Sequence, residues 1–317
     1  MSNARVTGLR GVELGVTDLN QSAAFYSAVW GLEPVVSEND TIHLRANGGE
    51  HHIVTLRERP KAGLLGVHFA ANDKAAVNEL HANARAFGAQ VLADPADLPR
   101  SAGGGYGFGF KTPEGHVLNI SSDVAAHPNT VNDRSKPTKL SHVVLNSARI
   151  EEQTRFFTDL LGFKLSDATD MMDFIRCCSD HHSVAFARGN GPTLNHMAYE
   201  VANIDGLMRG AGRVRAKGFN IEWGVGRHGP GDNVFSYFVE PNGFVVEYTT
   251  EVEQVDESTF IAHDAEYWRN FPGRPCRWGM GGHPSNRLRA AMGGDTTVAN
   301  PEDGKRCEEI MAQKLGR

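Results

Sequence analysis

The chain has 317 residues, of which 40% are hydrophobic and 22% charged, and its formal net charge is −6. This length suffices for two domains with buried cores, and the acidic balance argues against a basic surface that gathers nucleic-acid phosphates. Apolar runs stay well short of the roughly 20 residues of a membrane helix, and the first residues, MSNARVTGLRGVELG, lack the layout of a signal peptide. We therefore expect a cytoplasmic protein without nucleic-acid or membrane partners.

The first predicted elements are a strand and an amphipathic helix, and this pair recurs later in the chain. The segment GVELGVTDLNQSAAFYSAVWGLEPV, from Gly11, aligns without gaps with HVVLNSARIEEQTRFFTDLLGFKLS, from His142. Both predict an apolar strand, a polar break, a helix with an aromatic pair, and a stop at Gly31 or Gly162. An internal repeat of this kind decides the architecture.

Two further segments recur in the same order. LLGVHFAANDKAAVNELHANARAFGAQV, from Leu64, matches TLNHMAYEVANIDGLMRGAGRVRAKGFNI, from Thr193, and each predicts a strand, a helix and a glycine stop. YGFGFKTPEGHVLNI, ending at Ile120, matches FSYFVEPNGFVVEY, ending at Tyr248. Both of the latter predict hairpins, because Pro-Glu-Gly and Pro-Asn-Gly are ordinary turn sequences.

Three matched pairs in one order predict two homologous domains, residues 5–122 and 139–250, each built from two strand-helix-strands units. Residues 123–138 are polar and contain two prolines, as expected of an exposed linker. The remaining tail, 251–317, is rich in Gly, Pro, Trp and Arg around FPGRPCRWGMGGHPSN. Its Trp268, Arg274 and Trp278 are candidates to cap a pocket or to line a subunit contact, although a tail packed on the surface is the simpler interpretation.

The two domains differ at three positions that matter for chemistry. The second domain has His142, His196 and Glu247 at the positions where the first domain has Gly11, about Gly66 and Asn119. Two histidines and one carboxylate on one face of a metal leave the opposite positions open, which is typical of non-haem iron(II) enzymes. If Val246 packs into the apolar shell, strand alternation points Glu247 into the cavity of the second domain, where a buried carboxylate needs a cation.

The motifs LSHVVLN, HHSVAFA, LNHMAYEV and RHGPGDNVFSYFVEPNGFVVEY resemble those of the type I extradiol ring-cleavage dioxygenases of the vicinal oxygen chelate superfamily. The resemblance covers about residues 5–250. It implies an α+β fold of the glyoxalase/bleomycin resistance/dioxygenase type, with paired βαβββ modules in two homologous domains. It also implies that His142, His196 and Glu247 bind Fe(II), with Mn(II) as the alternative metal, inside a half-open barrel.

The same resemblance implies three catalytic groups, His182, His228 and Tyr237. A neutral imidazole suits His182 for taking and returning a proton, and His228 and Tyr237 would hydrogen-bond the substrate oxygens. The alternatives are ordinary surface histidines at His182 and His228, and a core tyrosine at Tyr237. The pair His51 and His52 in the first domain has no nearby ligand set in the sequence, so we interpret it as structural.

The implied reaction is extradiol (meta) cleavage of a catechol-type diol with dioxygen, giving a muconate-semialdehyde-type product in aromatic compound catabolism by a homo-oligomer. Fold alone cannot decide this, because the superfamily also contains glyoxalase-type metal-dependent lyases and isomerases and non-catalytic small-molecule-binding proteins. Monocyclic, bicyclic and trihydroxylated catechols all remain open as substrates. The segment MMDFIRC, Met171–Cys177, indicates only that the pocket wall is apolar.

Overall fold

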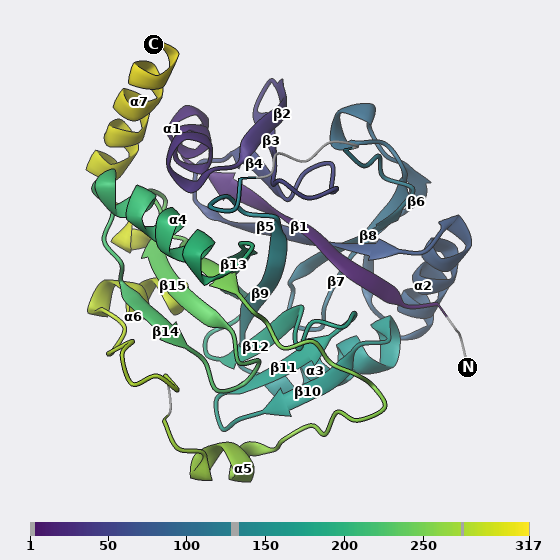
Figure 1. Ribbon diagram of the computed structural model, residues 1–317. Coiled ribbons are helices and arrows are strands. Elements are labelled where there is room, and N and C mark those ends of the chain that lie inside the picture. The colour runs from purple at the N-terminus through teal and green to yellow at the C-terminus, as the bar shows by residue number, and fades with distance from the viewer. Residues whose placement is uncertain (1–3, 128–132, 274–275, 317) are drawn as a thin grey trace.

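The computed structural model describes residues 4–127, 133–273 and 276–316, and these residues form two eight-stranded sheets packed side by side (Figure 1). The strands of the first sheet are β1 (Val6–Val16), β2 (Glu33–Glu38), β3 (Thr41–Arg45), β4 (Val54–Glu58), β5 (Gly63–Ala71), β6 (Gln90–Asp97), β7 (Tyr106–Lys111) and β8 (Val117–Ser122). Its helices are α1 (Leu19–Ala24), continued by a π-helical turn (Phe25–Trp30), and α2 (Lys74–Ala86).

The second sheet repeats this arrangement with the second half of the chain. Its strands are β9 (Lys139–Ser147), β10 (Lys164–Ala168), β11 (Met172–Arg176), β12 (Val184–Arg188), β13 (Thr193–Glu200), β14 (Trp223–Arg227), β15 (Val234–Val239) and β16 (Val245–Thr250). Its helices are α3 (Ile150–Leu161) and α4 (Ile204–Ala216).

The strand orders are β2-β3-β4-β1-β5-β8-β7-β6 and β10-β11-β12-β9-β13-β16-β15-β14, so each sheet consists of two βαβββ modules. The modules meet where β1 pairs antiparallel with β5, and β9 with β13. Within each module the first and last strands pair in parallel. The expected α+β fold of paired modules is therefore confirmed.

Capping side chains mark the starts of α2 and α4, and α3 ends at the expected glycine. Asp73 accepts a hydrogen bond from the backbone N–H of Ala76 at 2.8 Å and caps the start of α2, and Asn203 caps α4 in the same way. Gly162 ends α3 with a left-handed φ of 74°, a conformation that a glycine adopts without strain. These stops position each helix against its own module.

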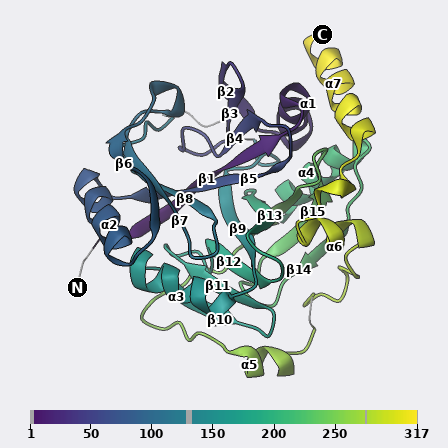
Figure 2. The same cartoon turned by 180° about the vertical axis from the view of Figure 1, so that it is seen from behind.

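The two sheets share one hydrophobic core. The ring of Trp30, from the first domain, stacks on Tyr248, from the second, with centroids 3.8 Å apart, and the Tyr248 hydroxyl donates to the Trp30 carbonyl. Arg213 reaches the same carbonyl at 3.1 Å. Away from this junction, α2 and α3 lie side by side and form a second contact between the domains (Figure 2). The domains are thus joined by buried contacts as well as by the chain.

Residues 133–138 of the expected linker contact both sheets, with Pro137 buried and Arg134 exposed. The Pro137 carbonyl accepts from the backbone N–H of Asn47 at 2.9 Å, and the N–H of Thr138 donates to the Glu200 carbonyl at 2.7 Å. Arg213 binds the backbone and hydroxyl oxygens of Ser135. The segment lies between the sheets because both sheets offer its backbone partners, which its polar composition did not indicate.

After β16 the chain wraps the second domain and returns to the first (Figure 1). The tail contains α5 (Ala265–Asn270), α6 (Asn286–Met292) and α7 (Pro301–Leu315). Helix α6 contacts β13 and β15, and α7 contacts α1. Arg274 lies outside the described residues, and among the described helices none is long and apolar enough to cross a bilayer.

Candidate metal and substrate site

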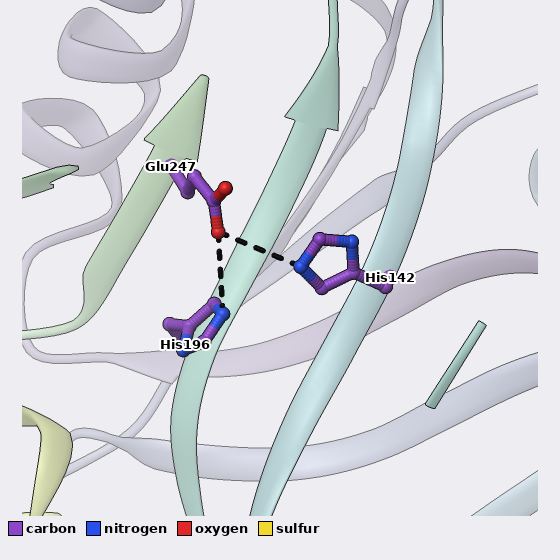
Figure 3. A group of neighbouring side chains, drawn as sticks. All are labelled: His142, His196 and Glu247. Carbon is purple, nitrogen blue, oxygen red and sulfur yellow. Dashed lines mark ion pairs between the residues drawn. The ribbon is translucent and has the colours of Figure 1, made fainter. Parts of the chain in front are cut away.

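Three neighbouring central strands bring His142, His196 and Glu247 together (Figure 3). His142 on β9 lies opposite Ala198 on β13, and Ala198 lies opposite Glu247 on β16. The Oε2 atom of Glu247 is 3.5 Å from Nε2 of His142 and 3.3 Å from Nε2 of His196. All three side chains are buried, and Glu247 is fully excluded from solvent.

The same strand pairing identifies the corresponding positions of the first sheet. Gly11 on β1 lies opposite His68 on β5, and His68 lies opposite Asn119 on β8. Gly66 then occupies the place that His196 holds in the second sheet. The sequence repeat and the strand ladders therefore identify the same three positions in the first domain.

The geometry of the three side chains suits one divalent metal ion. Among the described residues, Glu247 Oε2 has no hydrogen-bond donor although it is buried. Donor atoms bound about 2.1 Å from one ion at right angles lie about 3 Å from one another, close to the separations seen here. Burial alone would raise the pKa of Glu247, but the imidazoles of His142 and His196 hold it well below its usual range.

Contacts of the other ring nitrogen, Nδ1, orient both imidazoles so that Nε2 faces the carboxylate of Glu247. Nδ1 of His196 donates to the side-chain oxygen of Asn195 at 2.8 Å, and the Asn195 amide in turn donates to Asn146 at 3.0 Å. Nδ1 of His142 lies 3.3 Å from the Ser141 hydroxyl. Such outer contacts fix the tautomer and ring orientation of metal-binding histidines.

Asn195 and Asn233 were missed by the sequence reasoning. Asn195 sits at a β-bulge between Leu194 and His196, and strand alternation would otherwise send adjacent side chains to opposite faces. Asn233 donates to Glu247 Oε1 at 3.3 Å from the loop before β15. A bulge and a loop contact leave no periodic signal in the sequence.

A cavity of about 530 Å³ opens beside the three side chains. His142, His182, His196, His228 and Tyr237 all line it. The cavity wall also contains apolar side chains from several elements, namely Val144, Met171, Met172, Phe174, Trp223 and Met292. The apolar wall expected from MMDFIRC is present, and Met292 shows that α6 of the tail closes one side.

His182, His228 and Tyr237 lie within this cavity in two groups. The His182 ring is 3% exposed and its centroid is 4.2 Å from that of His142. Nε2 of His228 lies 2.9 Å from the hydroxyl of Tyr237, whose ring packs edge-on against His196. Burial raises the pKa of Tyr237 well above its usual value, so its hydroxyl keeps its proton and can donate a hydrogen bond.

Comparisons with known proteins give the chain a family. A sequence profile of the Glyoxalase/Bleomycin resistance protein/Dioxygenase superfamily matches residues 8–120 and 139–248. Metapyrocatechase 2 of Cupriavidus necator is 26% identical over 239 residues, covering 66% of this chain and 72% of that protein. Manganese-dependent 2,3-dihydroxybiphenyl 1,2-dioxygenase of Geobacillus genomosp. 3 is 25% identical over 255 residues, covering 73% and 80%.

A solved structure also resembles the chain along most of its length. The Mn(II)-bound glyoxalase of Novosphingobium aromaticivorans is 42% identical, with a TM-score of 0.82, and the match covers 90% of this chain and 94% of that one. The relatives therefore include both proteins named as dioxygenases and one named as a glyoxalase.

Proposed function

The chain belongs to the Glyoxalase/Bleomycin resistance protein/Dioxygenase superfamily, and within it we propose that this protein is an extradiol dioxygenase of aromatic compound catabolism. It would cleave a catechol-type ring beside its two hydroxyls with dioxygen. One observation carries the proposal: the cavity beside the two-histidine, one-carboxylate cluster is also lined by His182, His228 and Tyr237. Two relatives named as a metapyrocatechase and a dihydroxybiphenyl dioxygenase support it.

In this proposal His142, His196 and Glu247 hold Fe(II), with Mn(II) as the alternative. Ligands on one face of such an ion leave the opposite positions free for a chelating diol and for dioxygen, whose reaction the ion promotes. The protein keeps the ligand set anionic and preorganised, because Glu247 is held ionised and both imidazoles present Nε2 to it.

His182 is the proposed base that accepts a proton from a substrate hydroxyl. Its ring lies against His142, inside the cavity and out of solvent, so a bound diol would meet it without intervening bulk water. A neutral imidazole can accept this proton and later return it to an oxygen of the opened ring.

His228 and Tyr237 are proposed to hold the substrate oxygens by hydrogen bonds. Their polar atoms already lie 2.9 Å apart, and Trp223 stacks on the Tyr237 ring with centroids 5.1 Å apart, which fixes its orientation. The apolar wall would enclose the aromatic ring and exclude water from the site. Substrate orientation then comes from side chains that are ordered before binding.

The test is anaerobic loading with Fe(II) or Mn(II), followed by air and a panel of catechol, 2,3-dihydroxybiphenyl and a trihydroxybenzene. Stoichiometric oxygen uptake with a yellow ring-opened product is the expected result. His182→Asn should bind metal normally and lose most turnover, whereas His52→Asn in the first domain should keep it. A complete absence of oxygen uptake across the panel with both metals would reject the proposal.

A glyoxalase-type lyase or isomerase is the second candidate, favoured by the 42% identity to a Mn(II)-bound glyoxalase. Such a reaction consumes no oxygen. Isomerisation of a methylglyoxal–thiol adduct under anaerobic conditions, without any oxygen-dependent ring opening, would favour it. Failure to retain Mn(II) or Fe(II) under all loading conditions would instead point to a non-catalytic binding protein.

A further inference from the structure

A buried hydrogen-bonded chain leads away from the cavity through His182, His181 and Asp167. Nδ1 of His182 lies 3.1 Å from Nδ1 of His181, and Nε2 of His181 lies 3.0 Å from Oδ2 of Asp167. All three side chains are at most 3% exposed. The other carboxylate oxygen, Oδ1, accepts the backbone N–H of His263 at 2.7 Å. None of these three side chains belongs to the candidate ligand set of His142, His196 and Glu247.

The partners decide which ring nitrogens carry protons. An ionised carboxylate only accepts hydrogen bonds, so a neutral His181 facing Asp167 carries its proton on Nε2. Its Nδ1 then holds a lone pair, and the short contact to His182 requires a proton on Nδ1 of His182. A neutral His182 with its proton on Nδ1 has a lone pair on Nε2. Because Nδ1 already contacts His181, Nε2 is the ring nitrogen available to a ligand in the cavity that His182 lines.

We propose that Asp167 and His181 are positioning residues that fix His182 as the tautomer whose Nε2 accepts a proton in the cavity. The inference deepens the proposed function and rests on it for its catalytic meaning. The proton moves from a substrate hydroxyl oxygen to Nε2 of His182, leaving an anionic oxygen and an imidazolium. His182 keeps its Nδ1–H bonded to His181, and the carboxylate stabilises the new charge through the intervening ring.

The surroundings hold this chain in place. Gly231 packs directly over the two rings, since a side-chain carbon there would meet Nδ1 of both His181 and His182 at 3.1 Å. The loop is tied down because the Gly231 carbonyl accepts from Glu253, whose own carbonyl accepts the N–H of His181. The hydrogen-bonded residues His181 and Asp167 are therefore held by Glu253 and His263, which both follow the last strand of the second sheet.

The first domain contains the same histidine pair without the carboxylate. Nδ1 of His51 lies 3.0 Å from Nδ1 of His52, matching the pair in the second domain. The strand ladders place Val36 where the second domain has Asp167, and His51 stacks instead on His127. The carboxylate thus accompanies the proposed catalytic domain, while the histidine pair alone occurs in both.

Asp167→Asn tests this proposal because the side chain keeps its shape while the atom that faces His181 changes from a hydrogen-bond acceptor to a donor. The N–H of His263 pins the amide oxygen, so the amide nitrogen must face His181 and donate to it. His181 would then carry its proton on Nδ1 and donate to His182, whose proton would move to Nε2. The lone pair that faces the cavity would be lost.

We expect Asp167→Asn to lower kcat for 2,3-dihydroxybiphenyl about 10–100-fold, with KM and bound metal per protein unchanged. The matched control is Asp173→Asn, the same substitution on β11, where the carboxylate accepts from the Thr154 hydroxyl at 2.6 Å, away from the cavity. This control should leave kcat within about twofold of wild type.

A second measurement does not depend on activity. Two-bond ¹H–¹⁵N spectra of full-length, zinc-loaded protein labelled in histidine, assigned with His181→Asn and His182→Asn, report each ring's tautomer. Wild type should show a neutral Nε2–H ring at His181 and a neutral Nδ1–H ring at His182, and Asp167→Asn should reverse both. A doubly protonated His181, or tautomers unchanged by Asp167→Asn, would overturn the inference. Correct tautomers in a protein without ring cleavage would reject only the proposed function.

Discussion

The two domains have the same strand order, the same modules and a matching histidine pair, yet among the described residues only the second gathers a set of side chains that could hold a metal ion. The first has its own cavity of about 390 Å³, where Glu13 lies between Arg57 and His68. The difference comes from a few positions on central strands rather than from the fold. A fold therefore provides places for a site, and individual side chains decide whether the chemistry exists.

The backbone of the first domain also leaves no room for a side chain at Gly11, the position that corresponds to His142. A side-chain carbon at Gly11 would lie 2.6 Å from the carbonyl oxygen of Ile53, which accepts the N–H of Val12 at 3.0 Å. Backbone in a hydrogen-bonded ladder cannot move aside as a flexible side chain can. The comparison thus predicts that metal sites cannot be exchanged between the domains by substitution alone.

The largest expected effect comes from Glu247→Gln. Removing the anionic ligand should reduce metal affinity by about 100-fold or more and abolish turnover. Loss of a residue that only hydrogen-bonds to a metal ligand already lowers metal affinity or activity by about 10–100-fold. Metal analysis and oxygen uptake measure both effects, and circular dichroism checks that the fold persists. Asn119→Gln, at the corresponding place in the first domain, should change neither quantity, and full activity in Glu247→Gln would remove the proposed ligand set.

The hairpin turns of the two domains should differ in how their stability depends on pH. Buried Glu240 accepts the backbone N–H groups of Asn242 and Phe244, where the first domain has Thr112. Burial raises the pKa of Glu240 to about 7, although these hydrogen bonds partly offset the shift. The folded protein therefore keeps a proton that the unfolded chain releases near its ordinary pKa of 4.5.

The free energy of unfolding should accordingly fall between about pH 4.5 and 7, by up to about 3 kcal/mol from this group, and level off above pH 7. Urea titrations across this range measure the slope. Glu240→Gln should remove this component of the slope, whereas Thr112→Val should leave it in place. An equal slope in wild type and Glu240→Gln would contradict the assignment.

Gly11→Ala tests whether the first domain is closed to side chains at the ligand position. The added carbon must displace backbone, so we expect a loss of about 1–3 kcal/mol in unfolding free energy. The control is Gly63→Ala on β5, where the described residues leave open space around an added carbon. Equal urea midpoints for the two variants would show that the strand at Gly11 can relax.

The smallest effect concerns the outer contact of His196. Asn195→Ala removes the acceptor of its Nδ1–H, so metal affinity should fall about tenfold while the fold and the cavity remain. Competition with a metal chelator measures this change. Leu65→Ala, at the corresponding position of the first domain, should not alter metal affinity.

The repeat made much of the protein predictable, because an internal alignment shows where one copy differs from the other. The module order, the helix stops and the positions corresponding to His142 and Glu247 follow from it. Contacts made through irregular backbone or distant segments were not predictable. Asp167 meets His181 at a bulge, and Met292 reaches the cavity from the tail. Such contacts depend on tertiary packing rather than on local periodicity.

The three candidate ligands lie on neighbouring strands at the centre of an eight-stranded sheet. Their spacing is therefore maintained by the backbone ladders of β9, β13 and β16, and separating them requires breaking the sheet. Amide protons of Val143, Met197 and Val246 should exchange with deuterium only through global unfolding, and more slowly than those of the edge strands β10 and β14. The site would then persist as long as the folded protein itself.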